Sequence, residues 1–317
     1  MNVAAAATVL VAGSANLDFV VRAAHVPAPG ETVLGHGFNT FPGGKGANQA
    51  VACARAGGAA TQMLLALGDD DFAKPIEASL RAAGVALSIV REPALPTGTA
   101  FICLADTAEN AITVAPGANA CLRAAHLPPL DGIGWLLLQL ETPLDTVTAY
   151  ARSARAAGLK VALNAAPAQV LPAALLELLD VLIVNEGELA VVAGNPPDLA
   201  TGLARLAVPC VIVTLGARGC LARVEGQVVL QPAFRIAPLD TTAAGDTFCG
   251  ALVAALAGGQ SMAQALLAAT AASALACTRL GAQSSIPTRA EVDALMSDPA
   301  RVPGADAHAA LAAWCAR

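Results

Sequence analysis

The feature that most constrains the fold is an alternation of short apolar runs with helical patterns along most of the chain. Most of the runs end in a polar residue or glycine, and strands this apolar are buried on both faces. The pattern predicts a doubly wound α/β fold, a mostly parallel sheet with helices on both faces. Strands are expected at residues 8–12, 63–67, 135–140, 160–164, 181–184 and 210–214, and helices at 47–56, 72–83, 144–157, 173–179 and 199–206.

Two segments break this alternation. Residues 16–42 and 97–115 are richer in β-formers, glycine and polar residues than in helical periodicity. They predict either a small lid of extra strands or a pair of long surface loops. A further strand pair is expected at 227–236, and helices at 247–257, 262–278 and 289–296. We expect one domain over residues 1–317, with a terminal helix of unassigned role after Asp298 and no internal repeat.

Composition and charge exclude several classes of protein. With 56 % apolar and 13 % charged residues, the 317-residue chain is not a disordered one. A net charge of −6 argues against a nucleic-acid surface. The eight cysteines form no C-x-x-C pair, which favours small buried hydrophobes over disulfides or metal ligands.

No membrane segment is expected either. No apolar run of roughly 18 residues has spanning character. The apolar start of the chain lacks a basic region and runs into Gly13, so it predicts a strand and its turn rather than a signal peptide. The expected compartment is the cytoplasm.

The segment 240–250, DTTAAGDTFCG, carries the clearest chemistry. Ala243, Ala244 and Gly245 are small residues directly before an apolar helix, where free amides and the helix dipole bind anions. Asp246 would repel an anion, and work as a general base is one reason for a carboxylate there. From this segment alone, an ordinary helix N-cap is the more frequent alternative.

A second glycine-rich segment is Gly43-Gly44-Lys45-Gly46, before the helix expected at 47–56. Glycines with a lysine suggest close approach of the backbone to a polar ligand, and a flexible turn is the alternative. Gly46 stands where a P-loop has Ser or Thr, and no G-x-G-x-x-G follows the first strand. The sequence therefore excludes both common nucleotide fingerprints.

Taken in order, these segments resemble the ribokinase family of PfkB-type carbohydrate kinases over residues 8–287. The matching pieces are GSANLD (13–18), PGET (29–32), GGKGANQA (43–50), Glu109-Asn110, GANA (117–120), QLE (139–141), NEGE (185–188), TLGARG (214–219), DTTAAGDTF (240–248), and Gly281-Ala282-Gln283 with Ser285.

The resemblance implies a ribokinase-like fold with a small β-sheet lid, and transfer of the γ-phosphoryl group of ATP to a sugar hydroxymethyl. Asp246 would be the base, and the amides of Ala243, Ala244 and Gly245 would hold the charge on the transferred group. The implied sugar-binding set is Asn16, Asp18, Gly44, Lys45, Gly46, Ala47, Asn48, Glu141 and Asp246. Without the resemblance, Asp18 is equally a turn residue and Glu141 an acid at a helix N-terminus.

For ATP, the resemblance implies Asn185, Glu188, Thr214, Leu215, Gly216, Ala217, Arg218, Gly219, Gly245 and Thr270. Glu188 completes an N-x-x-E pattern that organises Mg²⁺ in the family, largely through water. On the residues alone, Glu188 is an acid on a solvated helix face. A potassium site is implied at Asp240, Thr242, Ala276, Arg279, Gly281 and Ser285, mostly through backbone carbonyls. A homodimer through the lid is expected by analogy.

The acceptor is expected to be D-ribose, phosphorylated at its 5-hydroxyl. Ala243 stands where many members of the wider family carry Gly, and alanine is common in the members that act on ribose. Asn164-Ala165-Ala166-Pro167 departs from their usual N-P-A-P. Alternatives are another pentose, a ketohexose, a nucleoside, or a non-catalytic sugar- or nucleotide-binding regulator. Aromatic residues such as Phe38, Phe41 and Phe101 are few near the lid segments, which favours a bare sugar over a nucleoside.

Overall fold

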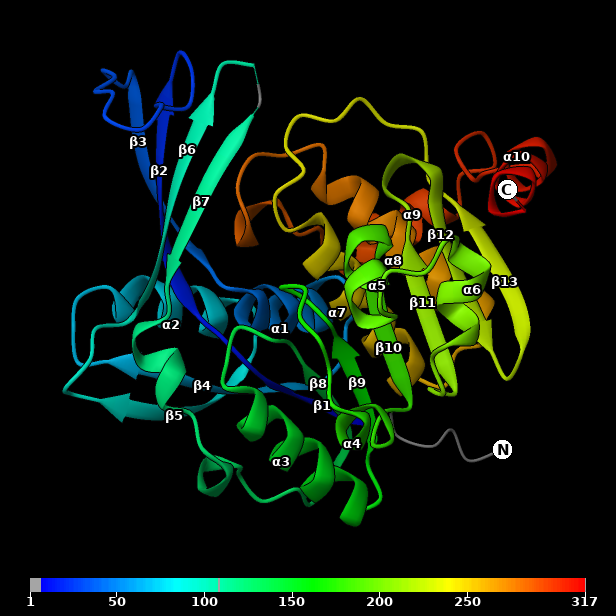
Figure 1. Ribbon diagram of the computed structural model, residues 1–317, viewed down its shortest axis with the longest axis horizontal. Coiled ribbons are helices and arrows are strands. Elements are labelled where there is room, and N and C mark those ends of the chain that lie inside the picture. The colour runs from blue at the N-terminus through cyan, green and yellow to red at the C-terminus, as the bar shows by residue number, and fades with distance from the viewer. Residues whose placement is uncertain (1–6, 108, 317) are drawn as a thin grey trace.

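A nine-stranded mixed sheet runs through the body of the molecule in the computed structural model (Figure 1). The structure describes residues 7–107 and 109–316; the expected domain and lid segment also included residues 1–6, 108 and 317, which lie outside the described part. Seven strands pair in parallel, and β12 and β13 add an antiparallel edge. In spatial order the strands are β13 (Gln227–Pro232), β12 (Gly219–Val224), β11 (Cys210–Thr214), β10 (Val181–Asn185), β9 (Lys160–Asn164), β8 (Ile133–Leu138), β1 (Thr8–Ala12), β4 (Thr61–Gly68) and β5 (Ala86–Glu92).

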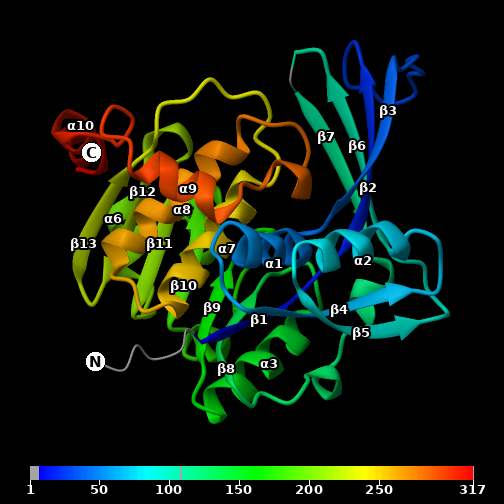
Figure 2. The same ribbon diagram turned by 180° about the vertical axis from the view of Figure 1, so that it is seen from behind.

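Helices cover both faces of this sheet and create two cores (Figures 1 and 2). In β1, Val9 and Val11 face one core while Leu10 and Ala12 face the other, and all are buried. The predicted doubly wound fold is therefore confirmed. The first core packs α1 (Lys45–Arg55), α2 (Ala73–Ala82), α7 (Ala244–Ala257), α8 (Met262–Ala276) and α9 (Arg289–Met296); the second packs α3 (Leu144–Ala156), α4 (Ala173–Leu176), α5 (Glu186–Val192), α6 (Leu199–Ala204) and α10 (Ala305–Cys315).

The two irregular segments form a second, four-stranded sheet that stands away from the body (Figure 1). Its order is β3 (Gly37–Gly43), β2 (Asn16–Ala23), β6 (Gly98–Ala105) and β7 (Asn110–Ala115). A small sheet, rather than surface loops, is thus the correct interpretation. Asp18 pairs with Phe41 and Phe19 with Thr40, so alternate residues of β2 point to opposite faces.

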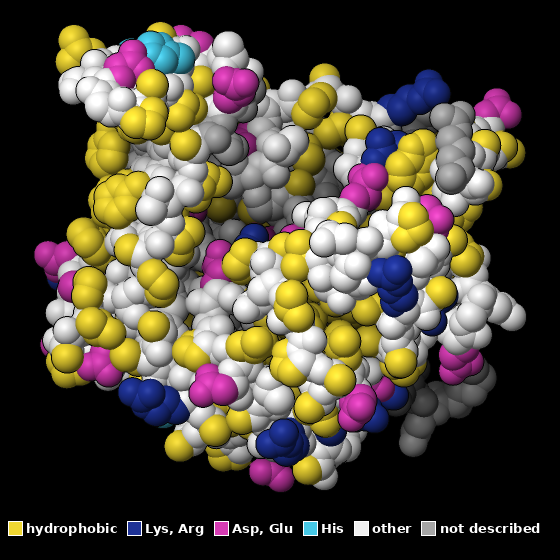
Figure 3. Space-filling model, in the orientation of Figure 1, with side chains coloured by type: hydrophobic (Ala, Val, Ile, Leu, Met, Phe, Trp, Pro, Cys, Tyr) yellow, Lys and Arg dark blue, Asp and Glu magenta, His cyan; other side chains and the backbone are white. Residues whose placement is uncertain are grey.

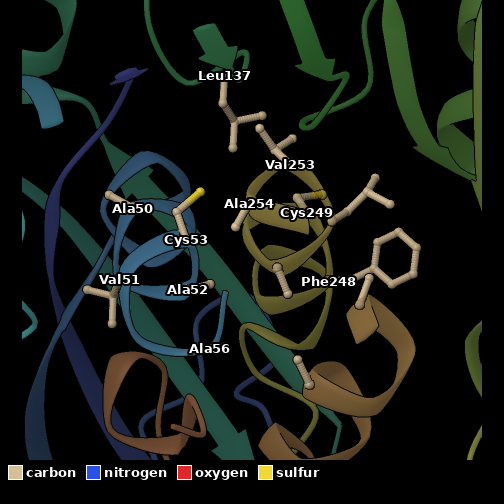
Figure 4. Close-up of a cluster of buried hydrophobic side chains, with 14 of the residues drawn as sticks. Ala50, Val51, Ala52, Cys53, Ala56, Leu137, Phe248, Cys249, Val253 and Ala254 are labelled. Atoms are coloured by element: carbon tan, nitrogen blue, oxygen red, sulfur yellow. The ribbon is translucent and has the colours of Figure 1, made fainter. Parts of the chain in front are cut away.

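Helices α1 and α7 approach closely because the residues between them are small (Figure 4). The thiol of Cys53 donates to the carbonyl of Gly250 at 3.2 Å. A Cβ added to Gly250 would lie 2.5 Å from the Cβ of Ala52 and 2.8 Å from the amide of Cys53. This contact sets the first turns of the two helices side by side, and those turns carry the site described below.

One strand prediction was wrong in position. The pair expected at 227–236 is instead β12 and β13, joined at Glu225 and Gly226, which both have positive φ (49° and 86°). Such residues make the tight turn that matches the twist of a hairpin.

The cysteines follow the expectation only in part. All eight are free, and Cys53, Cys210, Cys220 and Cys249 are buried, while the other four are half-buried. Among the described residues, no helix has both the length and the apolar character needed to cross a membrane.

Candidate active site

Polar residues gather where the parallel strands end, below the lid. Strands β1 and β8 are neighbours in this sheet. The next strand of the sheet after β1 is β4, on one side of the pair, and the next after β8 is β9, on the other side. The carboxyl ends of β1 and β8 therefore form the switch point at which α/β sheets bind ligands. A hollow opens between the lid and the body (Figure 3). The residues at these strand ends are Ser14, Glu141, Asn164, Asn185 and Thr214.

Asp246 lies in the first turn of α7, which begins at Ala244, earlier than the expected start at 247. Ala243 precedes the helix in the left-handed conformation (φ 57°). The amide of Ala244 donates to Thr241 O at 3.2 Å, whereas no described residue accepts from the amides of Ala243 and Gly245. Two of the three expected anion-binding amides are therefore free, and the third serves a turn.

The Asp246 carboxylate is buried, with 8 % of the residue exposed, and both of its oxygens accept bonds from α1. Asn48 Nδ2 donates to Oδ2 and Gln49 Nε2 donates to Oδ1, each at 2.9 Å. Asn48 was predicted for the site, but Gln49 was overlooked. Its adjacency to Asn48 in GGKGANQA was the only signal, and the sequence does not reveal which face of α1 points to α7.

Lys45 begins α1, and acids surround it. Its amide donates to Glu141 Oε2 at 3.0 Å, and the hydroxyl of Ser14 donates to the same oxygen at 2.5 Å. Glu141 thus serves a helix N-terminus, as its structural alternative predicted, although of a different helix. The nearby Asp246 carboxylate raises the pKa of Lys45; burial opposes this and Glu141 adds to it.

Asp18 and Asn16 lie side by side at the root of the lid, and both are buried. Burial raises the pKa of Asp18 to about 7, with Glu141 and Asp246 adding to the effect. Asn16 Oδ1 accepts from Asn119 Nδ2 at 2.8 Å. A Cβ on Gly43 would lie 2.7 Å from Asp18 Oδ1, so only glycine leaves room for this carboxylate. Asp18 is a strand residue, not a turn residue.

The remaining residues of the glycine-rich segment bond or pack against the turn that follows β1. The amide of Gly46 donates to Ser14 Oγ at 3.3 Å and that of Ala47 donates to Ser14 O at 2.9 Å. Gly44 has φ 87°, and a Cβ there would lie 2.7 Å from the amide of Asn16. Here glycine permits close approach of two backbone segments.

A cavity of about 650 Å³ adjoins the start of α7. The expected residues that line it are Thr214, Gly216, Ala217, Gly219, Gly245 and Thr270. Apolar residues complete the wall and were not anticipated, among them Phe234, Ile236 and Phe248. Leu215 is buried, and Arg218 pairs with Glu186 at 2.6 Å and lies 4.1 Å from the ring centroid of Trp314 in α10.

A smaller cavity of about 180 Å³ lies beside the first, and its wall includes Lys45, Asn185, Glu188 and Asp246. Gly245 lines both cavities. Asn185 and Glu188 also form a capping box, in which each side chain accepts from the other's amide at 2.8 Å. Burial raises the pKa of Glu188, opposed by the bond from the Asn185 amide.

Two of the residues expected to bind a cation, Thr242 and Gly281, meet at the carboxylate of a third, Asp240. Asp240 accepts from the amides of Thr242 (2.8 Å) and Gly281 (2.9 Å), which joins the two halves of the predicted set. The Arg279 side chain pairs with Glu291, and Ser285 Oγ donates to Ala282 O at 2.8 Å. No cluster of three His, Cys, Asp or Glu residues that could hold a metal occurs in the described part of the chain.

Comparison with known sequences gives one family model and a set of relatives. The model for pfkB family carbohydrate kinases matches residues 6–289. A ribokinase of Haemophilus influenzae is 38% identical over 299 residues, covering 90% of this chain and 96% of the relative. A ribokinase of Bacillus subtilis is also 38% identical, covering 91% and 99%.

Solved structures agree with these matches. A ribokinase from Thermotoga maritima superimposes with a TM-score of 0.84 at 36% identity, covering 92% of this chain and 100% of its own. An Arabidopsis thaliana ribokinase complexed with ribose and ATP gives a TM-score of 0.84 at 32% identity, covering 92% and 99%.

Proposed function

The chain belongs to the pfkB family of carbohydrate kinases, and we propose that it phosphorylates D-ribose at the 5-hydroxyl, using ATP and giving ribose 5-phosphate and ADP. The observation that carries this proposal is the place of Asp246. It lines the smaller cavity next to Gly245, which also lines the larger one. A phosphoryl group held at Gly245 therefore lies between a nucleotide on one side and a hydroxyl facing Asp246 on the other.

In this reaction Asp246 accepts the proton of the 5-hydroxyl as the oxygen attacks the γ-phosphorus. The bond from that phosphorus to the bridging oxygen breaks, and ADP leaves with the electron pair. The free amides of Ala243 and Gly245 donate to the transferred group, and the positive end of α7 favours its charge. The Lys45 ammonium, between Asp246, Glu141 and Glu188, balances the acids around it.

The sugar would bind at the root of the lid. Asn16, Asp18, Asn48 and Glu141 supply amide and carboxylate groups there, which suit a polyol. Asn48 Oδ1 is buried without a partner among the described residues, so it can accept from a sugar hydroxyl. On the lid, Phe41 shares the face of Asp18, whereas Phe19 lies on the opposite face. One aromatic on the sugar-facing side favours a bare sugar over a nucleoside.

The nucleotide would occupy the larger cavity, with its base near Thr270 and its phosphates toward Gly245. One carboxylate oxygen of Glu188 accepts from the Asn185 amide in the capping box, and the other can bind water. That donor set fits Mg²⁺ held through water and the ATP phosphates, where it neutralises charge on the transferring group. Leu215 and Arg218 would act by shaping the loop from Thr214 to Gly219.

The Asp240 segment would hold K⁺. Asp240 links Thr242 to Gly281, and the Arg279 side chain turns to Glu291, so Arg279 offers only its carbonyl. A cation there would neutralise the acid and steady the loop that leads to Ala243. Turnover should be higher in K⁺ than in Na⁺ at equal ionic strength; equal rates in both salts would remove this site.

The function is tested by coupled ADP release with D-ribose, 2-deoxyribose, other pentoses, ketohexoses and adenosine. We expect ribose to give the highest kcat/KM. Asp246→Asn should lower kcat by about 100-fold or more while leaving ribose and ATP binding near the parent values, since a general base contributes in that range. If no acceptor gave turnover, and parent and variant bound ribose alike, the chain would be a regulator rather than a kinase.

We also propose that the protein is a homodimer located in the cytoplasm. The face of the lid that carries Phe19 exposes Phe38 and Phe101, which suits a homodimer through the lids. A reaction that uses ATP and a free sugar fits the cytoplasm.

A further inference from the structure

Gln49 is the middle of a buried row of amides that ends on Asp246. Its Nε2 donates to Asp246 Oδ1 at 2.9 Å and to Asn164 Oδ1 at 3.0 Å. Its own Oε1 accepts from Gln139 Nε2 at 2.7 Å. Gln49 and Gln139 are fully buried, so these bonds have no competition from water.

This row fixes which way the Gln49 amide faces. Gln139 follows β8 and holds the carbonyl end of Gln49, while Asn164 ends β9 and accepts from the other end. Turned over, the Gln49 oxygen would face the Asp246 carboxylate and the oxygen of Asn164, whose own amide is held by a bond from its Nδ2 to Ile183 O at 3.3 Å. The central sheet therefore dictates that an N–H donor points at Asp246.

The charged groups around Asp246 act on the orientation of its carboxylate, which the Gln49 donor opposes. Lys45 from α1 attracts the Asp246 carboxylate, and Asp18 from β2 and Glu188 from α5 repel it, while the Cys249 thiol lies near it on the same helix. Left to these forces, the carboxylate would turn toward the ammonium. Gln49 and Asn48 each hold one oxygen, and each oxygen keeps a second lone pair for the substrate.

We propose that Gln49 is a positioning residue that aims the Asp246 carboxylate at the acceptor hydroxyl, its own amide being oriented by Gln139 and Asn164. This inference rests on the proposed function. Gln49 differs from Asn48, whose free oxygen can reach the sugar, because all the Gln49 polar atoms are taken up by protein partners. Gln49 would therefore act only through Asp246.

A double-mutant cycle tests this, run with whichever sugar the parent phosphorylates. Gln49→Met keeps the length of the side chain and removes its donors. We expect kcat to fall about 10-fold or more, as for loss of a bond to a charged group, with KM for sugar and ATP within about twofold. Added to Asp246→Asn, the same change should lower kcat by less than about twofold.

Equal losses in both backgrounds would overturn the inference, because they would mean that Gln49 only supports the fold. Unchanged kcat in Gln49→Met would overturn it as well. Gln62→Met is the control. Gln62 is half-buried, lies away from the site, and donates from Nε2 to Ser88 Oγ at 2.8 Å. This variant should keep the parent's kcat.

Should Gln49→Met fail to fold, Gln49→Glu keeps the shape and the acceptor for Gln139. It replaces the donor with a second acid against Asp246, and its loss of kcat should likewise vanish in the Asp246→Asn background. If the parent phosphorylates a sugar but the effects of the two substitutions on kcat are additive, only the inference about Gln49 is contradicted. If the parent phosphorylates none of the sugars, the proposed function is contradicted.

Discussion

At the scale of single residues, ionisation of the buried Asp18 carboxyl lowers the stability of the folded protein. Its carboxyl is buried with Glu141 and Asp246 nearby, and together these raise its pKa to about 7 from 3.8. The folded protein therefore binds a proton more tightly than the unfolded chain does. Stability from this group is complete below pH 4 and is lost as the pH rises toward 7.

Asp18→Asn should remove that pH dependence. The parent is expected to lose stability between pH 4 and 7 by at most about 1.4 kcal/mol per pH unit, and the variant to lose less. Without ligands, the variant should be the more stable protein at pH 8, although it would bind ribose more weakly. Urea unfolding at pH 5 and pH 8 measures this.

Asp131→Asn provides the control, because Asp131 is exposed. It should leave the parent's pH dependence as it is. A parent whose unfolding free energy does not change between pH 5 and pH 8 would show that Asp18 is ionised without penalty.

At the scale of elements, the sequence predicted what depends on local pattern. The strands at 8–12, 160–164 and 210–214 and the helix at 289–296 have the predicted bounds, because buried strands and amphipathic helices carry their own periodicity. It missed β5, which reads Ala-Leu-Ser-Ile-Val-Arg-Glu and lies at the sheet edge, half-exposed. It also gave no bounds for α5, which begins with the Asn185 capping box, although it offered a helix face as the alternative for Glu188.

The candidate site divides in the same way. Asp246 and Asn48 follow from motifs, but Gln49, Gln139 and Asn164 meet only because α1 packs on α7 above β8 and β9. Likewise, the sequence cannot show that the amide of Ala244 is occupied by Thr241. Contacts between distant segments depend on tertiary packing, which no local pattern encodes.

The packing of α1 against α7 gives a prediction at this scale. Gly250→Ala places a Cβ against Ala52 and Cys53, so the helices must separate. We expect a loss of about 1–3 kcal/mol in unfolding free energy from overpacking. We also expect kcat to fall, since Asn48 and Gln49 would move away from Asp246. Thermal melting and steady-state kinetics report the two effects.

Gly258→Ala is the matched control at the far end of α7. Its added Cβ would meet only Ala255 O and Ala254 O, at 3.4 and 3.5 Å, which is ordinary contact. It should keep the parent's kcat. If Gly250→Ala behaved like this control, close approach of the helices would not matter to the site.

At the scale of the whole molecule, the C-terminal helix contacts the loop from Thr214 to Gly219, which is proposed to bind ATP. Leu311 of α10 is buried in the second core, and Trp314 lies over the Arg218 guanidinium. Glu186 holds the same guanidinium from α5. The terminal segment, which had no assigned role, thus supports the loop from Thr214 to Gly219.

Trp314→Ala should therefore weaken ATP binding and not ribose binding. Loss of a cation–π contact of this kind should raise the KM for ATP about two- to tenfold. His308→Ala, an exposed position on the same helix, should change neither constant. Initial rates against each substrate measure both, and a rise in ribose KM alone would contradict the assignment.

The lid makes the second prediction at this scale. Phe38 and Phe101 are 63% and 55% exposed on one face, stacked on Phe19. Phe101→Glu should convert the expected dimer to a monomer in light scattering after gel filtration. Val170→Glu, at a 76% exposed position of the body, should leave the mass unchanged. A monomeric parent would contradict the dimer proposal.

The hairpin turn at Glu225 and Gly226 has a practical consequence. Of the groups proposed to bind the sugar, Asn16, Asp18, Asn48 and Glu141 precede it, whereas the proposed base Asp246, anion-binding amides and cation segment follow it. A chain divided there would give two fragments, each with half of the chemistry. Neither fragment could phosphorylate a sugar by itself, so recovered turnover on mixing would serve as a complementation assay.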